Sequence, residues 1–180
     1  MKKLTYMLVA SIILFGCAGN ETKKDSKAEA NAASVQAFYD QVLNGHNPAM
    51  MDSFCSADII DHQMDQYEGG NQGLEAVKAM MTEFFTAYPD LDIKANYIKA
   101  WGDTVMAHFT MTGTNKGPMM GMPATNKPVK IEGVDLVVFK DGKMSQHWGY
   151  QEDMKWMQQL GMMDNMPKEG EAGKMEETKK

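Results

Sequence analysis

Cysteine is nearly absent from this chain of 180 residues, which contains only Cys17 and Cys55. Cys17 ends an N-terminal leader, so the folded part of the chain cannot contain an intramolecular disulfide. The sequence also lacks a cluster of basic residues, and its formal net charge is −6. Binding to nucleic acid depends on clustered positive charge, so this composition argues against a nucleic-acid partner.

The leader has no apolar run long enough to cross a bilayer comfortably. Its run, Leu4–Phe15, follows two lysines and ends just before Cys17, a pattern typical of a cleaved secretory signal. The ending resembles a bacterial lipobox, in which the cysteine is lipidated. It therefore predicts a signal peptide over residues 1–16 and a lipid anchor on Cys17 that would tether an exported protein to the membrane of the bacterial cell envelope. The alternative is an ordinary signal with an incidental cysteine.

Two further segments have few large apolar side chains. Residues 17–33 are rich in alanine and charge, and residues 164–180 combine glycine and proline with alternating lysine and glutamate. Such segments bury too little apolar surface to offset their ordering entropy, so we expect a flexible tether and a disordered charged tail. Residues 34–163 between them have the length of one ordinary domain.

Apolar periodicity within the domain predicts three helices and then a sheet. The helices are expected over a stripe from Val35 to Val42, after Asn47-Pro48, and from Leu74 to Tyr88. Short alternating runs predict strands near residues 59–62, 93–101, 105–112, 129–139 and 144–150. Helices gathered before antiparallel strands indicate an α+β fold with helices on one face of the sheet. Cys55 is expected as a buried, inert thiol on the second helix.

Several motifs point to one family. The segment Gly102–Gly161 contains spaced glycines, an Asp in the following strand, DGK at a hairpin, HW and a final QQLG, and upstream stand DH at Asp61-His62 and YPDL at Tyr88–Leu91. Together they resemble the SnoaL-like polyketide (ester) cyclase family from about Val35 to Gly161. The resemblance implies the cone-shaped α+β barrel of the nuclear transport factor 2-like superfamily. In it, helices pack on a curved, mainly antiparallel sheet and enclose a pocket.

Asp135 is the most informative candidate for chemistry. It shares its strand parity with apolar residues at 129, 131, 137 and 139, so its carboxylate should face the core. A buried carboxylate must be paired, hydrogen-bonded or protonated, and a raised pKa would suit a general acid or base. The alternative is a structural acid bonded to a backbone amide or a tyrosine.

Two further candidates come from the resemblance, which places a histidine at His62 and an acid at Glu152. Gly149 stands where another acid is common in the family. We expect Asp135 or Glu152 to transfer a proton and His62 to donate to the developing oxyanion. Alternatively, His62 anchors its loop and Glu152 caps the last helix.

The remaining candidates are pocket walls and residues of the outer sheet face. The predicted pocket walls are Tyr67, Trp101, Met120 and Trp148. The outer face, which we expect to mediate a homodimer, carries His108, Thr110, Thr112, Ser145 and His147. With both strand histidines opposite Asp135, neither a metal nor a cofactor is expected.

The chain contains nineteen methionines, an unusually large number. Methionine is a flexible filler suited to an adaptable pocket, although clustered thioethers also bind Cu(I). The sequence therefore predicts an exported lipoprotein that binds a small, largely apolar molecule and catalyses cofactor-free acid–base chemistry on a carbonyl compound, as a cyclase or isomerase would. A ligand-binding module without catalysis and a Cu(I)-binding protein are the alternatives.

Overall fold

The computed structural model describes residues 19–64, 72–119 and 121–163. The predicted signal peptide, the lipidation site Cys17, the pocket residues Tyr67 and Met120, and the tail from residue 164 lie outside the described residues. Among the residues that are described, no helix is both long and apolar enough to span a membrane.

The helices and strands follow the order predicted from the sequence. They are α1 (Gly19–Phe38), a π-helical turn (Tyr39–Leu43), a 3-10 turn (Pro48–Met50), α2 (Met51–Phe54), β1 (Cys55–Asp61), α3 (Leu74–Ala87), β2 (Asp92–Trp101), β3 (Thr104–Thr114), β4 (Pro128–Lys140), β5 (Lys143–Gln151) and α4 (Asp153–Leu160). Pro89 follows α3 closely and ends it, because proline cannot continue a helix.

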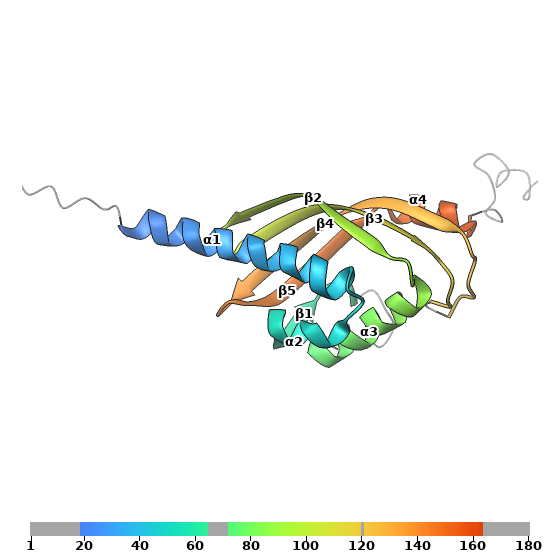
Figure 1. The fold of residues 1–180 in the computed structure, drawn as a ribbon, viewed down its shortest axis with the longest axis horizontal. Helices are drawn as coiled ribbons and strands as arrows, with labels where there is room; N and C mark the ends of the chain where they lie inside the picture. Colours follow the sequence, from blue (N-terminus) through green and yellow to red (C-terminus); the bar gives the residue numbers. More distant parts are fainter. Residues whose placement is uncertain (1–18, 65–71, 120, 164–180) are drawn as a thin grey trace, which may run out of the picture.

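The five strands form one curved sheet in the order β1-β5-β4-β3-β2. Strand β1 pairs with β5 in parallel, and the other neighbours are antiparallel. Figure 1 shows α1, α2 and α3 on one side of this sheet, with α4 at one end. The predicted α+β class and mainly antiparallel sheet are therefore confirmed.

Helix α1 begins inside the segment that we expected to be a flexible tether. Within the described residues 19–33, Ala28 and Asn31 are buried, and Asn31 Nδ2 donates a hydrogen bond to the Gly102 carbonyl at 3.1 Å. Lys27 also forms an ion pair with Asp103. Alanine, lysine and glutamate are strong helix formers, and this contact with the β2–β3 turn fixes the helix on the sheet. The expectation of a tether is wrong for this stretch.

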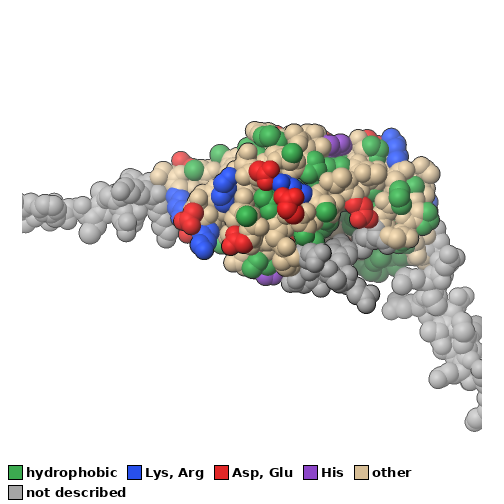
Figure 2. Space-filling model, turned by 90° about the horizontal axis from the view of Figure 1, so that it is seen from below, with side chains coloured by type: hydrophobic (Ala, Val, Ile, Leu, Met, Phe, Trp, Pro, Cys, Tyr) green, Lys and Arg blue, Asp and Glu red, His purple; other side chains and the backbone are tan. Residues whose placement is uncertain are grey.

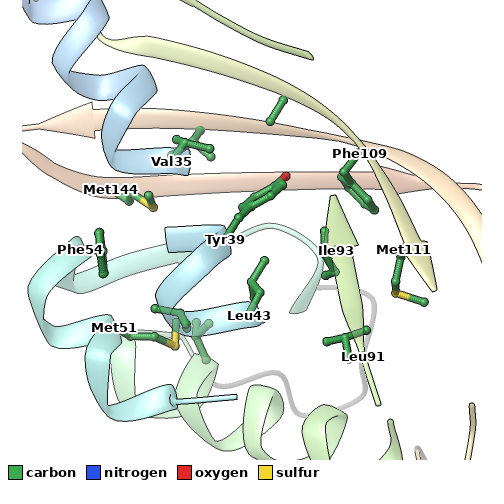
Figure 3. Close-up of a cluster of buried hydrophobic side chains, with 14 of the residues drawn as sticks. Val35, Tyr39, Leu43, Met51, Phe54, Leu91, Ile93, Phe109, Met111 and Met144 are labelled. Atoms are coloured by element: carbon green, nitrogen blue, oxygen red, sulfur yellow. The ribbon is translucent and has the colours of Figure 1, made fainter. Parts of the chain in front are cut away.

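The core lies between the helices and the covered face of the sheet. Val35 and Tyr39 from the helical side face Phe109 of β3 and Ile93 of β2 (Figure 3). Cys55 belongs to this core as the first residue of β1 rather than to a helix, because the chain becomes extended there (φ −104°, ψ 152°). Its predicted burial is confirmed.

Two β-bulges decide which side chains face the core. In β2, Ala95 pairs with Phe109 and Tyr97 with His108, so Asn96 is an extra residue. A bulge reverses the alternation of all residues beyond it. Ile98 and Ala100 therefore pack against the core, whereas Trp101 is 54% exposed on the outer face. The prediction of Trp101 as a pocket wall is wrong for this reason.

The second bulge lies in β5. Phe139 pairs with Met144 and Val138 with Gln146, which leaves Ser145 as the extra residue. Met144 faces the core before the bulge, and His147 faces it after the bulge, while Trp148 faces outward. The assignment of His147 to the face opposite Asp135 is therefore wrong.

Candidate functional site

A cavity of about 740 Å³ lies between the helices and the sheet. Most of its lining is apolar, and seven methionines contribute: Met51, Met64, Met80, Met81, Met111, Met119 and Met144. Aromatic rings of Phe84, Phe109 and Trp156 line other parts. The volume suits a small organic ligand, and unbranched thioether side chains can adapt to its shape.

Charged side chains of both signs share the face of the molecule drawn in Figure 2. On the face seen from below, acidic and basic groups lie side by side among apolar ones (Figure 2). Lys78, for example, pairs with Asp52 at 2.6 Å and with Glu75 at 2.9 Å. The charges on this face therefore give little steering of a charged ligand.

One polar cluster interrupts the apolar cavity wall. His147 Nε2 lies 3.1 Å from Asp135 Oδ1, and its Nδ1 lies 3.2 Å from Asp61 Oδ2. The Tyr39 hydroxyl donates a hydrogen bond to Asp135 Oδ2. The backbone N–H of Gln63 donates to Asp61 Oδ1 at 2.9 Å. Tyr39, Asp61, Asp135 and His147 are therefore each held by at least one hydrogen bond within the cluster.

Sheet pairing explains why these residues meet. Strand β5 lies between β1 and β4, and His147 pairs in register with Asp61 on one side and Val137 on the other. Asp135 points to the same face two residues before Val137. Tyr39 reaches the cluster from the π-helical turn, with its hydroxyl pointing toward the sheet (Figure 3).

Burial and charge set the protonation of the cluster. Burial alone lowers the pKa of His147, but its hydrogen bonds to Asp135 and Asp61 and their charges more than offset this and raise the pKa to about 10. Burial, followed by the charge of Asp135 and the hydrogen bond to it, raises the pKa of Tyr39 well above its ordinary value. At neutral pH His147 is thus an imidazolium hydrogen-bonded to both aspartates, and Tyr39 is a neutral phenol.

Of the three catalytic candidates predicted from sequence, Asp135 lines the cavity, whereas His62 and Glu152 do not. His62 stacks on Trp148 outside the cavity, with ring centroids 4.1 Å apart and planes 7° apart. Its Nε2 lies 3.2 Å from Gln146 Oε1. Trp148 is therefore a partner of His62 on the outer face rather than a pocket wall, a consequence of the bulge in β5.

Glu152 occupies the N-cap position of α4, without a side-chain capping hydrogen bond. Its Oε2 instead accepts hydrogen bonds from Lys155 Nζ at 2.7 Å and from the backbone N–H of Glu132 at 2.9 Å. The hydrogen bond with Lys155, and then that with Glu132, holds the pKa of Glu152 below its ordinary value. Glu152 therefore stays ionised at the surface, away from Asp135.

Sequence reasoning missed Tyr39, Asp61 and His147 as members of the site. Asp61 was visible in the same DH pair as His62, and strand parity would have favoured it because Ile59 is buried two residues earlier. Tyr39 gave no separate signal because it belongs to the apolar stripe from Val35 to Val42, which predicts only burial. His108, in contrast, lies on the outer face as predicted and pairs with Glu132 at 3.2 Å.

The charges around the cavity are mostly negative. The whole sequence contains no arginine, and no lysine lines the cavity formed by the described residues. His147 is the one cationic group in that lining, against Asp61, Glu83 and Asp135. Burying an anionic ligand here would add an unpaired charge, so the cavity favours an uncharged one.

Within the described ranges, no group of three or more His, Cys, Asp or Glu side chains is arranged to hold a metal ion.

Comparison with known proteins agrees with this architecture. The model of the SnoaL-like polyketide cyclase family matches residues 33–160. A search of curated proteins finds no match. Among solved structures, TsrD from Streptomyces laurentii is 23% identical with a TM-score of 0.64, covering 72% of this chain and 96% of its own.

Two further structures are similar. AclR from Streptomyces galilaeus is 24% identical with a TM-score of 0.63, covering 75% of this chain and 98% of its own. A SnoaL-like polyketide cyclase from Agrobacterium tumefaciens is 20% identical with a TM-score of 0.60, covering 71% of this chain and 95% of its own. At these identities the solved structures establish the fold.

Proposed function

The chain belongs to the SnoaL-like polyketide cyclase family, and we propose on that premise that it binds a small, largely apolar carbonyl compound and moves protons on it without a cofactor. One observation carries the proposal: Asp135 and His147 form a hydrogen-bonded acid–base pair in the wall of an otherwise apolar cavity. An enclosed apolar site strengthens electrostatic interactions with a reacting group and limits the access of water.

Asp135 is the proton acceptor in this mechanism. Its two oxygens each accept one hydrogen bond, from His147 and from Tyr39, and each retains a second lone pair. The carboxylate removes a proton from the carbon next to the carbonyl group, and the electron pair of the broken C–H bond moves onto the carbonyl oxygen as an enolate. The enolate then attacks a second carbonyl of the same molecule, whose oxygen takes the proton back from Asp135, or the enolate itself regains that proton at another carbon. The first outcome closes a ring and the second is an isomerisation.

His147 and Asp61 act as positioning groups. Asp61 accepts the Nδ1 proton of His147 and so orients the ring toward Asp135. The imidazolium offsets the negative charge of Asp135 between turnovers and holds its carboxylate in one rotamer. Asp61 is itself fixed by the Gln63 backbone and is only 2% exposed, so the arrangement is rigid before a ligand binds.

The experiment is a turnover assay with a panel of uncharged 1,3- and 1,5-dicarbonyl compounds, with products read by mass spectrometry and NMR. Asp135→Asn should lower turnover by about 10²- to 10⁴-fold, the range for loss of a general base, while ligand binding persists. Glu152→Gln, at the surface carboxylate, should change turnover by less than about twofold, because a surface substitution away from the site has little effect. Full activity in Asp135→Asn, or a large loss in Glu152→Gln, would refute the assignment.

A second candidate function is ligand binding without turnover. Gly149 favours this second function. The family often has an acid at this position, so this cavity has one carboxylate fewer for catalysis than the family pattern would give. In that case ligands should stabilise wild type and Asp135→Asn equally, and no panel compound should be converted. Heat protection without any product would select this function over the enzyme.

We also propose that the protein is exported and lipid-anchored through Cys17. The support is the leader sequence, in which a short apolar run follows two lysines and ends at this cysteine. Mass spectrometry of the mature N-terminus from a bacterial host should find a diacylglyceryl-modified cysteine. An unmodified cysteine or cleavage at another residue would refute the anchor.

A homodimer through the outer face of the sheet is the third part of the proposal. The two bulges place aromatic side chains there, including Tyr150, which is 65% exposed, and Trp101. Leu136 pairs in register with Trp148 and with Met106, so an apolar strip crosses three strands. This face is more apolar than the hydroxyl-rich surface expected from sequence. Contiguous apolar surface of this kind favours a protein partner.

A further inference from the structure

Gln63 occupies the space that a side chain at position 149 would fill. A Cβ atom built on Gly149 would lie 2.5 Å from both Cδ and Nε2 of Gln63 and 2.6 Å from its Oε1. All three are carboxamide atoms, so the end of the Gln63 side chain rests directly on the Gly149 backbone. Any residue larger than glycine at position 149 would push the carboxamide away.

This location puts the carboxamide beside the proton-transfer group. Gly149 pairs in register with Asp135, and paired residues of neighbouring antiparallel strands project to the same face. Their Cβ positions are typically about 4.5–5.5 Å apart, so the carboxamide stands next to the Asp135 carboxylate in the cavity wall. Gln63 and Asp135 both line the cavity.

Within the described ranges, the Gln63 backbone is hydrogen-bonded but its carboxamide has no hydrogen-bond partner. The backbone N–H of Gln63 is fixed by Asp61 Oδ1 at 2.9 Å, which makes a local turn. Among the described residues, no hydrogen bond reaches the side-chain oxygen or nitrogen of Gln63, and neither atom is among the fully enclosed unpaired ones. A carboxamide can donate two hydrogen bonds and accept two, and here that capacity faces the cavity.

We propose that Gln63 is the specificity-determining residue of the cavity, and that its carboxamide donates a hydrogen bond to the carbonyl oxygen of an uncharged ligand beside Asp135. The inference rests on the proposed function, since it names the group that recognises the ligand in the same cavity. It also assigns Gly149 a role: the missing side chain makes room for a neutral donor where the family pattern would place an acid. A neutral donor at this point suits a ketone or ester better than a carboxylate or a hydrocarbon.

Binding of two matched probes tests the inference. 2-Acetylnaphthalene and 2-ethylnaphthalene have nearly the same shape, and only the first carries a carbonyl oxygen. Affinities are measured by calorimetry or by competition with a fluorescent apolar probe. Wild type should prefer the acetyl compound by about 3- to 10-fold, the amount expected from one additional neutral hydrogen bond.

The variants separate the hydrogen bond from shape. Gln63→Met keeps the length of the side chain and removes its polar end. The two probes should then bind with about equal affinity, because the affinity for 2-ethylnaphthalene stays as in wild type and that for 2-acetylnaphthalene falls to it. Gly149→Ala displaces the carboxamide and should also remove the preference. The double variant should lose nothing further, because both changes remove the same interaction. Gln151→Met is the matched control at another glutamine of the lining and should keep the preference.

Each outcome is decisive. A full preference in Gln63→Met, or its loss in Gln151→Met alone, overturns the role of Gln63 while the cavity remains a binding site. Failure of both probes to bind wild type at millimolar concentration overturns the proposed function, and the role of Gln63 falls with it.

Discussion

The charge of His147 should make the stability of this protein depend on pH in a direction that can be calculated. Hydrogen bonds and the charges of Asp135 and Asp61 overcome the effect of burial and raise the pKa of His147 from 6.5 to about 10. Between these values the folded protein keeps a proton that the unfolded chain has released. The stabilisation is therefore complete below about pH 6.5 and is lost as the pH rises toward 10.

The magnitude follows from this linkage. One proton held by the folded state alone changes the free energy of unfolding by about 1.4 kcal/mol per pH unit. Over the two units from pH 7 to 9 this gives about 2.7 kcal/mol at most. The His147 side chain is 23% exposed, and some unfolded chains are still protonated at pH 7, so we expect about 2 kcal/mol.

Urea unfolding of wild type and His147→Gln at pH 7, 8 and 9 measures the effect. Wild type should lose about 2 kcal/mol more than the variant, and the subtraction removes other groups that titrate in this range, such as Cys55. Parallel pH profiles for the two proteins would refute the charged cluster. If the variant does not fold, an NMR titration of the wild-type imidazole serves instead, and loss of its charge below pH 8 would refute the reasoning.

Three further predictions concern packing and assembly. Gly133→Ala should lower the free energy of unfolding by about 1–3 kcal/mol in urea titrations, because the new Cβ at position 133 would lie 2.4 Å from the Phe109 ring. An unchanged unfolding midpoint would contradict this packing. If the proposed homodimer forms through the outer face, Leu136→Asp should give a monomer in light scattering where wild type gives a dimer, since it puts a charge into the apolar strip of that face. Equal masses for the two proteins would argue against that interface. Cys55 should react with a thiol reagent only after unfolding, because burial raises the pKa of its thiol to about 12, and rapid reaction in buffer would count against the fold near β1.

The fold could be predicted well from sequence because its signals are local. The stripe around Val35 and Val42, the helix ended by Pro89, and the alternation of β3 each depend on a few neighbouring residues, and the structure confirms them. Asp135 was correctly placed inside because no bulge interrupts β4 between its apolar neighbours and itself. Helix α1 was underestimated because the contact of Asn31 with Gly102 joins residues 71 positions apart.

The site could be predicted only in part because two bulges lie between the strong apolar signals and the functional residues. Asn96 and Ser145 have no feature in the sequence that marks them as extra residues, yet each reverses the face of every later residue in its strand. Trp101 and Trp148 therefore face outward and His147 faces inward, opposite to what strand alternation predicts. The apolar character of the outer face and the polar cluster inside have the same origin.

The order of the strands explains why His147 is the residue that joins the two acids. Asp61 ends β1 and Asp135 lies in β4, and these strands are separated by β5. A single side chain can reach both carboxylates only from the strand between them, and an imidazole is suited to this because its two nitrogens diverge. The sequence separations involved are 86 and 12 residues, so no motif spacing could show the contact. Because the bulge at Ser145 sets which residue of β5 faces inward, the polar cluster of the cavity depends on the pairing of the sheet as much as on the residues themselves.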